Sequence, residues 1–261
     1  MKKILSLMLA VVMCLCLAAC GTNEVIEDAT DATGVEAKHF VVATDMGFSP
    51  FEFQDAEGNI VGIDMDLLAA IAEDQGFTYD LQYIGWDAAI AACQAGQADG
   101  MIAGASITDA RKESGWIFSD GYYEATQGMA VAADSTIEGF ADLAGQTVAV
   151  KIGTMSQAYA DSIKAEYGFE VMTLETSADI YQAVMTGTAA ACMDDTPILK
   201  YSIKSGSLDM KFVEGTENEP AAYGFAIFNA DNQELVDLFN AGLANIRANG
   251  KYDEIIADYL G

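Results

Sequence analysis

From residue 40 onward the chain alternates between the hydrophobic periods of strands and of helices, and this alternation restricts its fold more than any other feature. Ile63, Leu67 and Ile71 share one face of a helix, which Asp64 is placed to cap and Gly76 to end. Strands and helices are expected in turn at 40–44, 63–76, 77–84, 86–96 and 98–104, with a hairpin at 51–62. Such alternation predicts a mainly parallel sheet with helices on its faces.

The same order recurs further along the chain. Strands are expected at 147–150, 169–175 and 188–193, with helices between them at 156–168 and 177–187. When Gly96 is aligned with Gly187, the two units agree in hydrophobic period and in the kinds of residue, although few residues are identical. A further strand at 223–228 and an amphipathic helix at 232–250 follow, with a short terminal helix after them.

The strand and helices left over after the second unit indicate that the chain returns to the first. We therefore predict an α/β protein of two lobes, each a mainly parallel sheet flanked by helices, joined by a two-strand hinge. Lobe 1 would comprise 38–122 and 223–261, and lobe 2 would be inserted at 126–219.

The first residues have the three-part layout of a secretory signal. Lys2 and Lys3 precede an apolar run at 4–17, which is short for a membrane span. "LAAC", ending at Cys20, resembles the bacterial lipoprotein cleavage motif. We expect a lipoprotein signal peptide at 1–19, a lipid on Cys20 and a flexible acidic tether at 20–37; an ordinary signal peptide is the alternative. The protein would then be extracytoplasmic and anchored to the bacterial cell membrane.

Charge and composition exclude several classes of function. The formal net charge is −28, and removal of 1–19 takes it to −30, so the surface should bind neither nucleic acid nor an anionic bilayer. The single histidine, His39, precedes the first strand, and no zinc-type cluster is present, so we expect no metal, cofactor or histidine-based catalysis. Cys93 and Cys192 are expected as buried free thiols.

In open parallel sheets, ligands bind beyond the carboxyl ends of the strands. This rule selects a short list of side chains from each predicted unit. From the first unit it selects Asp45, Phe48, Trp86, Gly104, Ser106 and the "TDARK" turn, and from the second Lys151, Thr154, Ser177, Asp194 and Asp195. Two lobes with facing loops of this kind would form a cleft.

Seven stretches in order carry a family resemblance over 38–261. They are "ATDMGFSPFEF", "GIDMDLLAAIA", "ITDARK", "FSDGYYE", "VKIGT", "DDTP" and "NGKYDEI". With them the chain resembles the family-three solute-binding proteins of polar amino-acid ABC importers, nearest to the glutamine-binding members. The resemblance implies the two-lobed periplasmic-binding-protein type-II fold and a free amino acid as the ligand.

Arg111 and Asp195 are the two residues expected to hold the amino acid. Thr108 can cap a short helix that places Arg111 in its first turn, and a guanidinium can bind a carboxylate with two parallel hydrogen bonds. Asp195 would accept the ammonium group, although an aspartate before Thr196-Pro197, itself predicted as helix cap and first helical position, could instead favour the helix dipole. The resemblance adds Ser106 and the backbone around Ala103 and Gly104.

The remaining site residues are expected around the ligand's side chain. Phe48 and Trp86 would enclose its aliphatic part, while Trp116, Tyr122 and Tyr123 are assigned to the core or hinge. Asp45, Lys151 and Asp194 would face its far end, with Thr154 and Met155 beside them. Glutamine-binding relatives carry a histidine where Asp194 stands and a small residue where Met155 stands. Glutamine is the predicted ligand, and arginine or lysine is the alternative.

The resemblance implies capture by hinge closure and delivery to a membrane permease with its ATPase, by a monomer held at the membrane only through its lipid. An enzyme of the same fold, such as a cyclohexadienyl-type dehydratase using Glu124 or the aspartate pair, is a second possibility. A ligand sensor acting in trans is a third.

Overall fold

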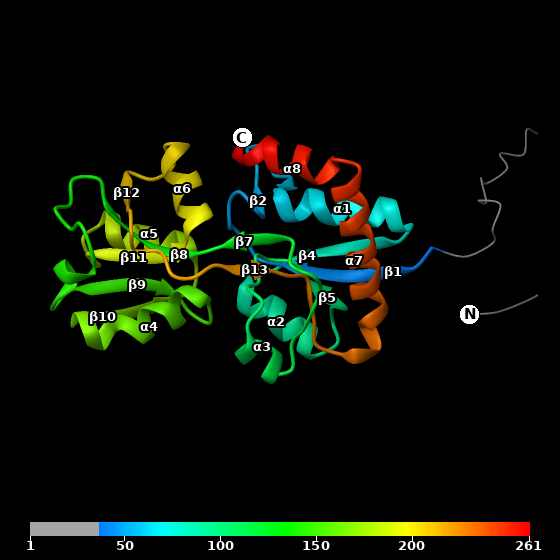
Figure 1. Cartoon of the computed structure of the whole chain (residues 1–261), viewed down its shortest axis with the longest axis horizontal. Helices are drawn as coiled ribbons and strands as arrows, with labels where there is room; N and C mark the ends of the chain where they lie inside the picture. Colours follow the sequence, from blue (N-terminus) through cyan, green and yellow to red (C-terminus); the bar gives the residue numbers. More distant parts are fainter. Residues whose placement is uncertain (1–36) are drawn as a thin grey trace, which may run out of the picture. The chain divides into compact units, whose positions relative to one another are not determined.

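The computed structural model describes residues 37–261, which form two lobes, each built on one five-stranded sheet (Figure 1). The predicted signal peptide, Cys20 and nearly all of the tether lie outside the described residues. Within 37–261, no helix is long and apolar enough to cross a membrane.

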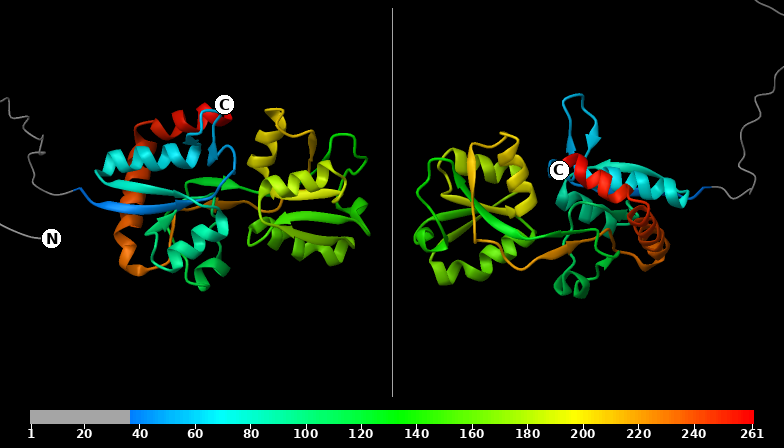
Figure 2. Two further views of the ribbon diagram at one scale, coloured as in Figure 1. Left: turned by 180° about the vertical axis from the view of Figure 1, so that it is seen from behind. Right: turned by 45° about the horizontal axis from the view of Figure 1, so that its top comes forward.

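Lobe 1 contains the sheet β4-β1-β5-β14-β6, with helices on both faces (Figures 1 and 2). Helix α1 packs against α7 and α8 on one face, while α2 covers the other face. The strands are β1 (His39–Thr44), β4 (Thr78–Tyr83), β5 (Gly100–Met101), β6 (Ile117–Phe118) and β14 (Ala226–Ile227). The helices are α1 (Ile63–Gln75), α2 (Trp86–Gln94), α3 (Asp109–Glu113), α7 (Gln233–Ala248) and α8 (Lys251–Leu260), and a hairpin joins β2 (Phe53–Gln54) to β3 (Ile60–Val61).

Lobe 2 contains the sheet β10-β9-β11-β8-β12. Helix α4 packs on one face and α5 on the other, and α6 lies against β8, β11 and β12. The strands are β8 (Gln127–Ala132), β9 (Thr147–Lys151), β10 (Glu170–Leu174), β11 (Ala191–Asp195) and β12 (Met210–Val213). The helices are α4 (Met155–Tyr167), α5 (Ser177–Met185) and α6 (Thr196–Lys204).

The two sheets share one design. In each, four of the five strands run in the same direction, and the fourth strand in the order, β14 or β8, runs opposite to its neighbours. The mainly parallel α/β prediction is therefore confirmed for both lobes. The reversed strand is the one through which the chain enters each lobe after crossing from the other.

Two short strands connect the lobes. β7 (Tyr123–Ala125) precedes β8, and β13 (Ala221–Tyr223) precedes β14, and the two pair antiparallel with Ala125 opposite Ala221 (Figure 1). Tyr223, the last residue of β13, and Tyr122, directly before β7, are fully buried.

Three local predictions were wrong. Asp64 does not cap α1, since the helix begins at Ile63 and the Asp64 side chain is completely buried, hydrogen-bonded to Gly104 N (2.9 Å). The cap of α6 is Asp195 and not Thr196, which is the first helical residue. The 223–228 strand shortens to β14, because Tyr223 belongs to the crossing strand.

Candidate functional site

A pocket between the two lobes brings all twelve of the predicted ligand-binding residues together. The volume of the pocket, including the part open to solvent, is about 330 Å³. The lining residues are Asp45, Phe48, Trp86, Ala103, Gly104, Ser106 and Arg111 from lobe 1 and Lys151, Thr154, Met155, Asp194 and Asp195 from lobe 2.

Arg111 enters the pocket from the short helix α3. Thr108 caps this helix as predicted, its Oγ1 accepting from Arg111 N at 3.2 Å. The guanidinium donates Nη1–H to the Ser106 carbonyl at 2.8 Å and lies about 5 Å from the ring centres of Trp86 and Trp116. Loss of water around it lowers the pKa of Arg111 to about 10, still high enough to keep the charge. Among residues 37–261, no carboxylate lies within ion-pair distance of this guanidinium.

Asp195 faces the pocket from the end of β11 and is already held by donors. Its Oδ1 accepts from Gln127 Nε2 at 2.8 Å, and its Oδ2 accepts from the Tyr223 hydroxyl. Burial, followed by the charge of Asp194, raises the pKa of Asp195 to about 6, while Arg111 acts in the opposite sense. Asp195 is therefore mostly ionised at neutral pH and fixed in direction.

Asp194 points to the opposite face of the same strand, as the two-residue period requires. Its Oδ2 accepts from the Tyr181 hydroxyl at 2.6 Å and its Oδ1 from Asp195 N at 2.9 Å. Burial raises the pKa of this carboxyl. The adjacent aspartates thus serve different faces: Asp195 lies toward α4, where Ser156 is its neighbour, and Asp194 lies toward α5.

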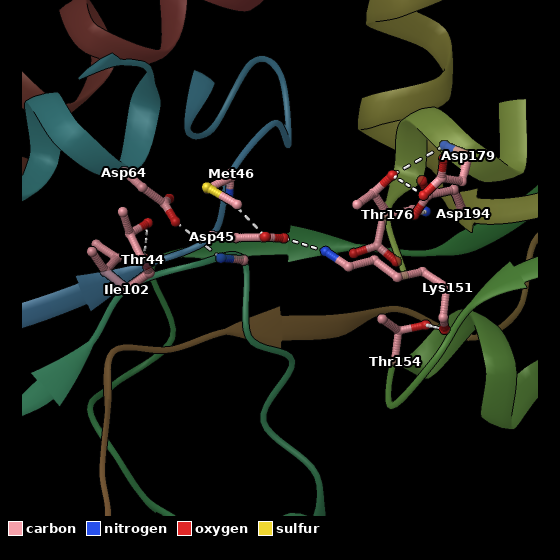
Figure 3. A network of polar contacts seen from close by, with 12 residues as sticks. Thr44, Asp45, Met46, Asp64, Ile102, Lys151, Thr154, Thr176, Asp179 and Asp194 are labelled. Carbon is pink, nitrogen blue, oxygen red and sulfur yellow. Dashed lines mark hydrogen bonds and ion pairs between the residues drawn. The ribbon is translucent and has the colours of Figure 1, made fainter. Parts of the chain in front are cut away.

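An ion pair crosses the pocket between the lobes. Lys151, at the end of β9, extends its Nζ to Asp45 Oδ2 at the end of β1 (Figure 3). Both side chains are only 6 % exposed, and Asp45 Oδ1 also accepts from Met46 N at 2.6 Å. The two groups at the far end of the pocket therefore neutralise each other.

Aromatic rings form the lobe 1 wall. Lys151 Nζ lies 5.9 Å from the ring centre of Phe48 and 6.0 Å from that of Trp86. The Phe48 ring lies so close to Gly104 that a Cβ there would stand 2.6 Å from Phe48 Cε1, and Gly104 has φ +54°, so glycine is required at this position. The buried indole N–H of Trp86 has no acceptor among the described residues.

The start of helix α4 forms part of the lobe 2 wall. Thr154 caps the helix by accepting from Gln157 N (3.3 Å), and its hydroxyl donates to the Lys151 carbonyl (2.7 Å). Met155 is the first helical residue, so its N–H is one of the helix donors without an intrahelical partner. This helix end can receive a partial negative charge from the pocket.

Sequence reasoning missed the residues that hold the site from behind. Gln127 and Tyr223 bind Asp195, and Tyr181 binds Asp194, from positions far along the chain. Glu52 and Asp64 lie buried behind Phe48 and Gly104.

Residues assigned outside the site lie outside it. Trp116 and Tyr122 are buried in the core, and Cys93 and Cys192 are buried free thiols, as predicted. Burial raises the pKa of Cys93 to about 12. Ser177, in contrast, was selected for the site by the strand-end rule but does not line the pocket. Glu124, on β7, has an exposed side chain. In the described part of the chain, no group of three or more His, Cys, Asp or Glu side chains could hold a metal ion.

The chain belongs to the bacterial extracellular solute-binding proteins, family 3, whose model matches residues 40–261. It is 29 % identical to the arginine-binding extracellular protein ArtP of Bacillus subtilis, over 98 % of this chain and 96 % of that protein.

Two solved structures show the fold. A second substrate-binding domain, from a protein of Streptococcus pneumoniae assigned as an amino acid ABC transporter, is 43 % identical with a TM-score of 0.61. The comparison covers 85 % of this chain and all of that domain. An ancestral arginine-binding protein bound to glutamine is 31 % identical with a TM-score of 0.78, over 87 % of this chain and all of that one. The two-lobed type-II periplasmic-binding-protein fold is thus confirmed.

Proposed function

We propose that this protein captures a polar α-amino acid between its lobes and delivers it to an ABC importer. One observation carries the proposal: Arg111 of lobe 1, which has no carboxylate partner among the described residues, lines the same pocket as the ionised Asp195 of lobe 2. A zwitterion presents the complementary charges, a carboxylate for the guanidinium and an ammonium group for the aspartate. Each charge-assisted hydrogen bond contributes about 1.5–3 kcal/mol.

Backbone and hydroxyl groups complete the proposed zwitterion site. The Ser106 hydroxyl makes no hydrogen bond within residues 37–261, and Ser106 lies beside Arg111 through its own carbonyl. Gly104 and Ala103 also line the pocket and, having no long side chains of their own, would offer backbone groups to the ligand. The ligand's carboxylate would lie on Arg111 and its ammonium near Asp195 and Ser106.

Glutamine is the proposed ligand. Its side-chain amide both donates and accepts, so it can bind Asp45 and Lys151 without requiring either to lose its charge. Phe48 and Trp86 would cover its methylene groups. Met155 contributes its backbone N–H.

Basic amino acids are the alternative, and the charge count of the pocket favours them. Asp45, Asp194 and Asp195 face Lys151 and Arg111, so a cationic side chain would neutralise the remaining negative charge. Arginine would have to draw Asp45 away from Lys151 or approach Asp194, whose two oxygens are already hydrogen-bonded. Related proteins named for arginine and one bound to glutamine keep both ligands in the test.

We propose hinge closure as the mechanism of capture. The Asp45–Lys151 pair joins the lobes, so groups of both lobes meet across the pocket. The ligand favours the closed form only through its greater affinity for that form, to which the Arg111 and Asp195 contacts contribute together. A micromolar dissociation constant corresponds to about −8 kcal/mol, which a few such contacts can supply.

The remaining parts of the proposal concern placement and partners. Lobe 1 would comprise 38–122 and 223–261, and lobe 2 126–219. A lipid on Cys20 would hold the monomer on the outer side of the bacterial cell membrane, where the closed form docks on a permease with its ATPase. No catalysis is proposed. Glu124 is exposed and does not line the pocket, and the aspartates of the pocket already accept hydrogen bonds from other side chains of the protein.

A thermal-shift screen over the twenty amino acids tests the proposal, followed by calorimetry on those that stabilise the protein. L-glutamine should raise Tm most. Stabilisation by L-arginine or L-lysine instead would replace the ligand and keep the class, and no response to any amino acid would overturn the class. Incubation with prephenate-like acids, with product formation as the readout, tests the enzymatic alternative.

A further inference from the structure

Two carboxyl groups lie completely buried behind the lobe 1 wall of the pocket, and the capture of a zwitterion gives neither of them a role. Glu52 and Asp64 have no exposed surface, and each carboxyl influences the pKa of the other. Their backbones are also joined, since Asp64 N donates to the carbonyl of Phe51 at 2.9 Å. Within residues 37–261, neither oxygen of Glu52 nor Oδ1 of Asp64 has a hydrogen-bond partner.

A buried carboxylate that accepts no hydrogen bond is costly, and a second carboxylate that acts on it adds repulsion. One of the two is therefore expected to carry a proton. Asp64 is the better anion, because its Oδ2 accepts from Gly104 N (2.9 Å) and from the Tyr122 hydroxyl (2.9 Å), whereas Glu52 has no donor at all. The protonated member is therefore Glu52, which would donate to Asp64, whose Oδ1 has no partner among residues 37–261.

The surrounding charges agree with this assignment. Burial, then Asp64 and Asp45, raises the pKa of Glu52 well above its ordinary value, and only Lys151 acts against them. Burial also raises the pKa of Asp64, to about 7, with Gly104, Tyr122 and Glu52 acting to lower it. The buried Tyr122 and the half-buried Tyr83 also interact with Glu52.

Each member of the pair is attached to a pocket residue. Asp64 holds the N–H of Gly104, and a trans peptide fixes the carbonyl of Ala103 in the opposite direction. The backbone of Glu52 pairs with that of Phe48 in both directions, at 2.7 and 3.3 Å. Phe48 in turn rests against Gly104. The pair therefore supports the wall that lies against the proposed zwitterion.

We propose that Asp64 is a positioning residue for ligand binding, which holds the Ala103–Gly104 peptide in its pocket orientation through a one-proton carboxyl pair with Glu52. The inference rests on the proposed function for its ligand but not for the pair itself. Because Asp64 never touches the ligand, it acts only through the wall. Its ionised form also places a negative charge behind the backbone groups that would face the ammonium.

The pair is tested first without any ligand. Infrared difference spectra at pH 8 should show a protonated carboxyl in the wild type that Glu52→Gln removes, while the exposed Glu57→Gln leaves it in place. A wild-type spectrum without this band would overturn the shared proton.

The positioning role is tested by calorimetry with L-glutamine. Asp64→Asn retains an oxygen for Gly104 N and should bind within about fivefold of wild type, whereas Asp64→Leu fills the same space without an acceptor and should lose at least tenfold. Asp66→Asn, an exposed change two residues along the same helix, should bind as wild type does. Equal binding by the Leu and Asn variants would overturn the role.

A failure of the ligand and a failure of the pair give different results. If wild type ignores L-glutamine but responds to L-arginine, the variants are compared with L-arginine, and the same Asn-over-Leu order is expected. If no amino acid binds, the positioning role falls with the proposed function. If Asp64→Leu does not fold, Glu52→Gln, which keeps a donor for Asp64, should bind within about threefold of wild type while Glu52→Leu loses more, and equal affinities would again overturn the role.

Discussion

The two lobes repeat one strand order, and each prepares one of the two charged groups of the proposed zwitterion site in a different way. Lobe 1 presents Arg111 on a five-residue helix, stacked near two tryptophans and without an ionic partner among the described residues. Lobe 2 presents Asp195 at the end of an internal strand, held by Gln127 and Tyr223. The proposed carboxylate-binding group thus has no anionic partner in the described residues, while the proposed ammonium-binding group is already oriented by two donors. The repeated architecture thus fixes where the groups stand, and local neighbours decide what each can bind.

The largest expected effect is the loss of Arg111. Arg111→Ala should weaken L-glutamine binding by at least about 100-fold, because two charge-assisted bonds together supply about 3 kcal/mol or more. Calorimetry measures the affinity and circular dichroism the fold. Lys112→Ala, an exposed neighbour, is the matched control and should bind normally. Micromolar affinity in Arg111→Ala would remove the guanidinium from the site.

The next effect separates the adjacent aspartates of lobe 2. Asp195→Asn should weaken binding by about 30-fold, because the ligand's ammonium group loses its carboxylate partner. Asp194→Asn should weaken binding by less than fivefold, because Asp194 is hydrogen-bonded to Tyr181. Both variants change one charge on one strand, so each controls for the other. The reverse order of affinities would show that the ammonium lies on the α5 face.

A smaller effect concerns the ion pair between the lobes. Lys151→Ala leaves Asp45 without its cation, so the ratio of L-arginine to L-glutamine affinity should rise about tenfold. Calorimetry with both amino acids gives the ratio, and Lys164→Ala on the exposed face of α4 is the control. An unchanged ratio would mean that the ligand's side chain does not reach the pair.

The smallest effect is on stability. The pKa of Asp195 is raised by burial to about 6, so the folded protein holds this proton where the unfolded chain releases it. That contribution is fully present below the unfolded pKa near 4 and is lost as pH rises through 6. It should reduce the free energy of unfolding by about 1 kcal/mol between pH 5 and pH 7. Urea titrations should show this part missing in Asp195→Asn and retained in the exposed Asp134→Asn.

The sequence predicted the pocket better than it predicted what supports it. Strand ends are visible in a hydrophobic pattern, and the rule that ligands lie beyond them selected Asp45, Lys151 and Asp195, which the structure places around one pocket. The partners of Asp195 could not be found in this way. Gln127 lies 68 residues away and Tyr223 lies 28 away, and only the crossing of the chain between lobes brings them together.

Two errors have a physical explanation. Asp64 precedes a helical pattern, where acidic residues commonly cap, and nothing local shows that its side chain turns inward to Gly104 and Tyr122. Strand β8 was not predicted at all, although it is buried over most of its length. It follows the crossing directly, so no turn marks its beginning, and its place in the sheet depends on pairing with β11.

The pairing of Ala125 with Ala221 has a consequence for how such proteins diversify. The chain passes from the first lobe to the second and back through two strands, β7 and β13, which pair with each other. Replacing the residues between these two strands by those of a relative would therefore leave the rest of the chain connected as it is. Every such chimaera would keep Arg111. The preference for the ligand's side chain could then change, while the proposed binding group for the α-carboxylate remained the same.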